Sequence, residues 1–244
     1  MEEFLVAFQF LTRLPILSVP YHEDSLSRSA KFFPIVGLTI GLCACLLQHA
    51  LALHLTRPLV ALLVLSFLVL ATGGLHEDAL ADAGDAFGGG NDRRQVLAIL
   101  RDSRIGSFGA LTLVLSLLAR FLLLSALPVN HFVNFVVSAH VLCRWTTLPL
   151  SLFLRSAREG DGQGIRIAKR ISPESVLVGT LLSLAIILYL MRIEFWIPAL
   201  VTVAITALSG FYYFRRIGGV TGDCFGATNQ LTEIAVYFCG VWSA

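Results

Sequence analysis

Phe32–Thr56 reads FFPIVGLTIGLCACLLQHALALHLT, which is 25 residues without Asp, Glu, Lys or Arg. At 1.5 Å per residue, a helix over this stretch can cross the ~30 Å hydrocarbon core of a bilayer. Comparable uncharged runs extend over residues 58–76, 121–143, 175–191 and 195–214. The whole chain of 244 residues is 56% hydrophobic and only 14% charged, with a mean hydropathy of +0.79. These values exclude an ordinary soluble domain and indicate a membrane protein.

The fold class that follows is all-α: a polytopic membrane helical bundle with about seven transmembrane helices. We expect these helices near residues 34–54, 58–75, 107–127, 131–154, 174–191, 195–214 and 226–242. Residues 4–14 read as an interfacial helix that ends before Pro15. No internal repeat and no long linker divides the chain, so residues 1–244 are expected to form a single integral membrane domain.

The distribution of basic residues predicts the orientation of this bundle. Fourteen Lys and Arg residues lie in the N-terminal segment and in the loops near 76–106, 155–173 and 215–225, whereas the opposite side receives only Arg57 and Arg192. Loops rich in Lys and Arg face the cytoplasm in most membrane proteins. A net charge of +2 adds no sign of a nucleic-acid partner. The expected surroundings are therefore the lipid bilayer, with the polar loops on the cytoplasmic side.

The densest polar segment, His76 to Asp85 (HEDALADAGD), places Asp78, Asp82 and Asp85 at positions i, i+4 and i+7. On a helix these three side chains fall within an arc of roughly 60°. Three like charges repel one another, and a hard divalent cation such as Mg²⁺ gives a reason to gather them. The alternative is a solvated helix face. Glu77 points about 100° away from Asp78, so its loss is expected to matter far less.

Other polar residues leave two interpretations open. Arg144, with His140 one turn before it, borders a polar cavity or is a structural arginine paired with Glu233 or another buried acid. Asp223 caps a helix or contacts a metal or substrate. The glycine-rich segment 156–164 approaches a phosphate or is an ordinary loop. Arg120 lies nearer the outer end of its span and is expected to extend to the membrane surface without a functional role.

Several motifs resemble one family. Residues 73–87 (GGLHEDALADAGDAF) and 101–109 (RDSRIGSFG) look like the signature of the cobalamin synthase family, adenosylcobinamide-GDP ribazoletransferase. Segments 10–15, 33–37 and 221–227 also match, so the resemblance covers nearly the whole chain. The chain departs from the family pattern at Gln230, where a Glu is expected, and in the loop from Arg158 to Gly164.

The resemblance implies a Mg²⁺-dependent enzyme of the bacterial inner membrane with its active site facing the cytoplasm. It joins adenosylcobinamide-GDP to α-ribazole, or to the 5′-phosphate of α-ribazole, and releases GMP. Asp82 is then the candidate proton acceptor. The expected metal ligands are Asp78, Asp82, Asp85 and Asp223. The expected substrate-binding residues are His76, Arg101, Arg104, Arg144 and Arg158. Arg101 and Arg104 suit a diphosphate because a guanidinium holds phosphate bidentately, although an Arg–Asp102 surface network is the alternative. A homo-oligomer is compatible with the sequence.

Two other functions are consistent with parts of the pattern. A CDP-alcohol phosphotransferase also carries a helix-borne aspartate cluster, but its Asp-Gly-x-x-Ala-Arg element is absent from this chain. A cation-coupled transporter would place carboxylates near the bilayer midplane on broken helices, whereas these aspartates are expected at a cytoplasmic helix end.

Overall fold

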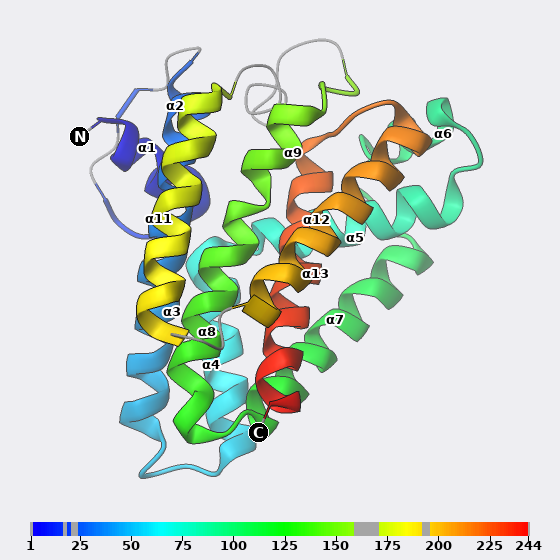
Figure 1. The fold of residues 1–244 in the computed structure, drawn as a ribbon. Helices are drawn as coiled ribbons and strands as arrows, with labels where there is room; N and C mark the ends of the chain where they lie inside the picture. Colours follow the sequence, from blue (N-terminus) through cyan, green and yellow to red (C-terminus); the bar gives the residue numbers. More distant parts are fainter. Residues whose placement is uncertain (1, 17–18, 21–23, 159–170, 192–195, 244) are drawn as a thin grey trace.

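The computed structural model describes residues 2–16, 19–20, 24–158, 171–191 and 196–243, and it is built of helices (Figure 1). The elements are α1 (Glu2–Leu11), α2 (Ser25–Ser29), the 3₁₀ helix η1 (Ala30–Phe32), α3 (Phe33–Leu51), α4 (Arg57–Thr72), α5 (Leu75–Gly89), α6 (Arg93–Ile99), α7 (Ser107–Ala126), α8 (Val129–Trp145), α9 (Thr147–Phe153), α11 (Pro173–Met191), α12 (Trp196–Ile217) and α13 (Gly222–Trp242). The described part of the chain has no strand, and its only β-type pairing is an isolated bridge between Ser156 and Val220. The predicted all-α class is confirmed.

The predicted count of seven spans is not confirmed. Within the described residues, five helical segments are long and apolar enough to cross a membrane: 25–51, 107–126, 129–153, 173–191 and 196–217. A sixth span results if α4 and α5 are taken together. The predicted last span corresponds to α13, which is 21 residues long but is not among these segments. Its middle carries five buried polar side chains: Thr228, Asn229, Gln230, Thr232 and Glu233.

The aspartate helix α5 follows α4 closely in the sequence, but it does not continue in the direction of α4. Gly73 and Gly74 separate α4 from α5 and have φ angles of 65° and 71°. Glycine adopts this left-handed region without the steric cost that a Cβ brings. The axis of α5 consequently lies at 87° to that of α4. The break turns the aspartates across the bundle, and α5 ends at Gly89 as the Gly88–Gly90 stop predicts.

Helices α8 and α13 form the centre of the bundle. α13 packs against α5, α7, α8 and α12, and α8 packs most extensively against α3. The share of buried residues is 83% in an 18-residue stretch of the α8–α9 segment, whereas it is 22% in such a stretch of α7 and 28% in those of α11 and α12. On α7 the exposed leucines Leu111, Leu115, Leu118 and Leu122 follow helical spacing along one side. α7, α11 and α12 therefore present apolar faces suited to lipid, while α8 and α13 supply the interior.

The close contact of α3 with α8 depends on Gly37, because a Cβ at this position would overlap the backbone carbonyl of His140. We expect Gly37→Ala to lower the free energy of unfolding by about 1–3 kcal/mol, the usual cost of overpacking. The measurement is the thermal unfolding midpoint in detergent. Gly89→Ala is the matched control, since its nearest neighbour would be the Cδ1 of Ile99 at an ordinary 3.8 Å. Equal midpoints for both variants would contradict this account of the helix contact.

Three loops that are distant in sequence meet at one end of the bundle (Figure 1). Arg93 donates to the carbonyls of Ile217 and Ala157, and Arg216 donates to the carbonyl of Gly90. Asp92 caps the start of α6, because its Oδ1 accepts the backbone N–H of Gln95 at 2.9 Å. The described parts of the three predicted polar loops thus form one surface, and the N-terminus of α13 lies at this surface.

Candidate active site

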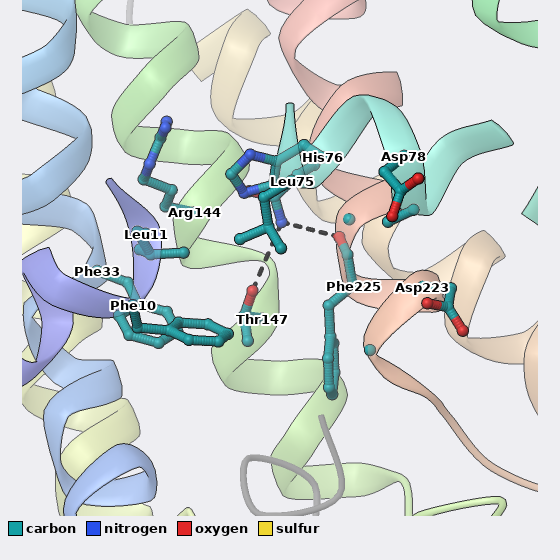
Figure 2. Close-up of a pocket in the computed structure, with 14 residues that line it drawn as sticks. Phe10, Leu11, Phe33, Leu75, His76, Asp78, Arg144, Thr147, Asp223 and Phe225 are labelled. Atoms are coloured by element: carbon teal, nitrogen blue, oxygen red, sulfur yellow. Dashed lines mark hydrogen bonds between the residues drawn. The ribbon is translucent and has the colours of Figure 1, made fainter. Parts of the chain in front are cut away.

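A cavity of about 170 Å³ opens between α5, α8 and α13, with α1 and α3 closing one side. His76, Asp78, Arg144 and Asp223, all singled out from the sequence, line this cavity together (Figure 2). The approach of α5 to α13 is close because Gly226 faces Ala79, and a Cβ on Gly226 would overlap that of Ala79. The predicted adjacency of the aspartate helix and the entrance of the last helix is confirmed.

Asp82 lies one turn beyond Asp78 and is partly buried. Burial, followed by the nearby charges of Asp78, Asp223 and Asp85, raises the pKa of the Asp82 carboxyl to about 6. At neutral pH the group remains largely ionised but holds a proton more readily than an ordinary aspartate. The four carboxylates are therefore close enough to repel one another, and a cation among them would relieve that repulsion.

Asp85 has a role that the sequence did not indicate. Its Oδ2 accepts the backbone N–H of Gly106 at 2.6 Å and its Oδ1 accepts that of Gly109 at 2.7 Å. Gly106 is the N-cap residue of α7 and Gly109 lies in its first turn, where a negative charge is favourable. A Cβ on either glycine would overlap this carboxylate. Asp85 thus fixes α7 to α5, and its predicted function as a metal ligand stays a prediction.

The N-cap residue of α13 is Thr221 and not Asp223, and the predicted contact of Asp223 with a metal or substrate stays a prediction. Asp223 lies in the first turn of α13, and its Oδ2 accepts bonds from Thr221 Oγ1 at 3.1 Å and from Arg158 Nη2 at 3.3 Å. The same Arg158 nitrogen donates to the carbonyl of Leu100 at 2.9 Å. The glycine-rich segment from residue 159 onward lies outside the described residues.

Beside this pair is a basic cleft of about 600 Å³, formed by α6 and the residues before the undescribed segment. It is lined by Arg93, Arg94, Leu97, Ala98, Arg101, Ala157 and Arg158. Arg104 is not part of it. The side chain of Arg104 is 87% exposed, and its guanidinium forms a bidentate ion pair with Asp102, with its shortest contact at 2.6 Å. The surface network that the sequence left open is thus the observed arrangement for Arg104.

The expectation for Arg120 is wrong. Its side chain is 1% exposed, and it binds Glu77 at 2.5 Å and Glu233 at 2.9 Å inside the bundle. Gln230 completes the group: its Oε1 accepts from Arg120 at 3.1 Å and its Nε2 donates to Glu77 at 3.2 Å. An amide both donates and accepts, so a glutamine suits a place between a cation and an anion. Glu77 therefore lies in a buried ion pair, and its replacement is expected to destabilise the bundle.

The signal that could have identified this network is the number of buried charges. Arg120, Arg144, Glu77 and Glu233 are the buried Arg and Glu residues among those described, so two positive charges balance two negative ones. Ionised groups in a membrane interior need partners. The sequence places them on α5, α7, α8 and α13, but no spacing rule pairs helices that are distant in the chain.

Arg144 stands at the edge of this network. Its Nη1 lies 3.1 Å from both Nδ1 and the carbonyl of His140. The Nε2 of that histidine lies 3.1 Å from the hydroxyl of Tyr237. The Nε of Arg144 has no hydrogen-bond partner among the described residues, although the side chain is only 2% exposed. The predicted position beside a polar cavity is confirmed, and no ion pair with Glu233 is formed by the described Arg144 side chain.

Within the described residues, one group of three side chains brings metal-binding atoms within 4.8 Å of one another: His140, Cys143 and Glu233. This group is an unfavourable cation site, since Arg120 binds Glu233 and Arg144 contacts both His140 and Cys143. The aspartates do not form such a group. Their donors are all carboxylates, the ligands that Mg²⁺ prefers, but they would have to draw closer around an ion.

Fold and site together define an all-helical membrane protein in which carboxylates from two helices meet a cavity and a basic cleft. A sequence model of the cobalamin-5-phosphate synthase family matches residues 3–241. The chain belongs to this family.

Individual relatives agree with that assignment. A protein of Shewanella amazonensis, described as adenosylcobinamide-GDP ribazoletransferase, is 35% identical over 97% of this chain and 94% of its own length. Proteins with the same description from Prosthecochloris aestuarii and Leptospira interrogans are 36% and 35% identical. They cover 92% and 97% of this chain, and 92% and 93% of their own lengths. A comparison with solved structures finds no match.

Proposed function

We propose that this chain joins adenosylcobinamide-GDP to α-ribazole, or to its 5′-phosphate, and releases GMP. A ribose hydroxyl of the acceptor attacks the phosphorus on the cobinamide side of the diphosphate. A new P–O bond forms, the anhydride bond breaks, and GMP leaves. The observation that carries the proposal is the meeting of Asp78 and Asp223, from two helices, at one cavity beside a cleft lined by arginines.

Asp82 is proposed to accept the proton of the attacking hydroxyl. A carboxylate with a pKa raised to about 6 is a stronger base than an ordinary aspartate and is still ionised at neutral pH. Burial of Asp82 and the nearby charges of Asp78 and Asp223 raise this pKa. The carboxylates that would hold a cation therefore also make Asp82 a stronger base.

The proposed cofactor is Mg²⁺, held by Asp78, Asp82 and Asp223, with Asp85 behind them. The mutual repulsion of these carboxylates fits a divalent cation, and the absence of Lys and Arg from residues 78–85 leaves the charge on α5 itself uncompensated. Bound Mg²⁺ supplies a Lewis acid that neutralises charge on the diphosphate. Arg158 already donates a hydrogen bond to Asp223, and its guanidinium can exchange that carboxylate for a phosphate of the substrate.

Arg101 and Arg158, which line the basic cleft, are proposed to hold the diphosphate and the departing GMP. Arg104 would have to release Asp102 before it could take part. His76 and Arg144 lie deeper, on the cavity side of the aspartates, and are proposed to contact the acceptor (Figure 2). The residues proposed to hold the departing GMP and the residues proposed to contact the attacking acceptor therefore lie in different parts of the site.

The test of this function is GMP release by the purified chain from adenosylcobinamide-GDP and α-ribazole, with Mg²⁺ and after its removal by a chelator. We expect release only when both substrates and Mg²⁺ are present. In proteoliposomes the same preparation should move no ion or solute. Flux without GMP release would instead favour a transporter.

The proposed location is the bacterial inner membrane, with the aspartates facing the cytoplasm, as the basic residues indicate. A cysteine at Asp92, which lies on the surface formed by the three loops, should react with an impermeant maleimide only from the cytoplasmic side. A Cys43→Ser background removes the exposed native cysteine. Labelling of position 92 in intact spheroplasts would overturn the orientation.

A further inference from the structure

An apolar groove of about 620 Å³ lies on the outside of the bundle, where the end of α8, α9, the first turn of α11 and one side of α12 meet. Figure 1 shows α9 between α11 and α12. The groove is hollow because α12 contributes small side chains to it: Thr206, Ala207 and Gly210. Binding sites for small molecules measure roughly 300–1,000 Å³. The groove is therefore large enough to hold a ligand.

The length of the groove matches the depth of one leaflet of a bilayer. Val203 and Phe214 are the first and last residues of α12 that line it. Eleven residues separate them, which is ~16 Å along a helix and about half of the ~30 Å hydrocarbon core. Phe214 lies in the last turn of α12, close to the surface formed by the three loops. The groove therefore opens at that surface, and we call the end beside Phe214 its mouth.

The side chains that line the groove leave no hydrogen-bond donor free. The hydroxyl of Thr206 donates to the carbonyl of Thr202 at 2.7 Å. The indole N–H of Trp145 donates to the hydroxyl of Thr180 at 2.9 Å. All other lining side chains are apolar. A polar ligand would lose its hydrogen bonds with water in such a groove, whereas a hydrocarbon chain has none to lose.

The mouth of the groove is positively charged. The Cζ of Arg215 lies 5.8 Å from the centroid of the Phe211 ring, and that ring lines the groove. Arg155 directly follows Leu154, another lining residue. No carboxylate of the described residues pairs with either arginine. Glu174, in the first turn of α11, brings one negative charge against these two positive ones. The described residues at the mouth thus favour an anion.

A second copy of the chain is the alternative occupant, because small residues let transmembrane helices approach one another closely. Gly210, however, is buried against α9: a Cβ there would meet Leu150 Cδ2 at 3.1 Å and Leu154 Cδ1 at 3.5 Å. The neighbouring rings of Phe211 and Phe214 are 63% and 58% exposed. A helix about 10 Å wide would rest on these rings, whereas a single acyl chain is thin enough to pass between them and α9.

We infer that this groove binds an anionic phospholipid of the leaflet next to the three loops, with one acyl chain in the groove and the lipid phosphate held by Arg215 and Arg155. A guanidinium donates two parallel hydrogen bonds to a phosphate, and basic residues near the membrane surface attract anionic lipids. The inference goes beyond the proposed function, since neither the aspartates nor the basic cleft takes part in it.

The experiment follows the fluorescence of Trp145, which lines the groove, in the full chain with Trp196→Phe and Trp242→Phe, so that no other tryptophan remains. The protein in detergent is titrated with phosphatidylglycerol or with phosphatidylcholine, each carrying bromine atoms that quench tryptophan on contact. We expect phosphatidylglycerol to quench at a roughly tenfold lower concentration, the usual value of a hydrogen bond from a charged donor. Equal concentrations for half-quenching, or no quenching by either lipid, would overturn the inference.

Two variants locate the lipid. Arg215→Gln should bring the half-quenching concentration of phosphatidylglycerol to that of phosphatidylcholine, and it should leave the latter within about twofold. Ala207→Phe fills the groove from an exposed position and should weaken quenching by both lipids roughly tenfold. Ala204→Phe is the matched control, because Ala204 is also exposed on α12 but does not line the groove, and neither lipid should be affected. An unchanged preference in Arg215→Gln, or equal effects of the two Phe variants, would contradict the assignment.

The molar mass of the same samples, from light scattering after size-exclusion chromatography, tests for a second copy in the groove. We expect Ala207→Phe and Ala204→Phe to have the oligomeric state of the wild-type chain. A dimer that Ala207→Phe dissociates and Ala204→Phe preserves would show that the groove is an interface between copies, and the lipid assignment would then be wrong.

Discussion

Replacing Asp82 with Asn should lower the turnover of adenosylcobinamide-GDP by at least about a hundredfold, which corresponds to about 2.7 kcal/mol in the activation free energy. The variant keeps the size of the side chain and one oxygen, but it loses the charge at the middle of the carboxylate cluster and the proposed proton acceptor. Folding should be preserved, because a partly buried carboxylate that repels Asp78, Asp223 and Asp85 becomes neutral. The measurements are kcat at saturating Mg²⁺ and the thermal unfolding midpoint.

Asp92→Asn is the matched control for this experiment. It is the same substitution in the same polar loop, and asparagine caps a helix about as well as aspartate. The control should keep wild-type turnover. If Asp82→Asn is also as active as the wild type at equal expression, the metal and the base lie elsewhere and the proposed site is wrong.

Replacing Arg120 with Met should destabilise the bundle more than any other single change considered for this chain. The substitution leaves Glu77 and Glu233 buried without their cation, and breaking a buried ion pair in this way costs about 3–5 kcal/mol. We expect a large fall in the unfolding midpoint and in the yield of monodisperse protein in detergent. Arg215→Met, a change of the same kind at the end of α12, should have little effect on either.

A triple variant separates loss of charge balance from loss of side-chain volume. Arg120→Met combined with Glu77→Gln and Glu233→Gln removes all three charges and keeps the shapes close to the original. Neutral replacements of buried ion pairs are often tolerated, so this variant should recover most of the lost midpoint. A single Arg120→Met variant as stable as the wild type would mean that these ion pairs do not hold α5, α7 and α13 together.

Much of the molecule follows from local patterns in the sequence. Uncharged runs such as 32–56 predict helices because each turn must satisfy its own backbone hydrogen bonds in lipid. The Gly88–Gly90 stop and the Asp92 cap predict helix ends, because they act within one or two turns. The i, i+4, i+7 spacing places Asp78, Asp82 and Asp85 on one face, since a helix has a fixed period. The helix positions and the shared face of the three aspartates can therefore be predicted without knowing how the helices pack.

Other features required the packed structure. The 87° break at Gly73–Gly74 turns the aspartates toward α13, and Asp85 meets the start of α7 instead of standing free. Arg120, expected at the membrane surface, lies between Glu77 and Glu233, which are 43 and 113 positions away along the chain. Periodicity determines which way a side chain points on its own helix. Which distant helix it then meets depends on how the helices pack, and so on small residues such as Gly37 and Gly226 and on the pairing of buried charges.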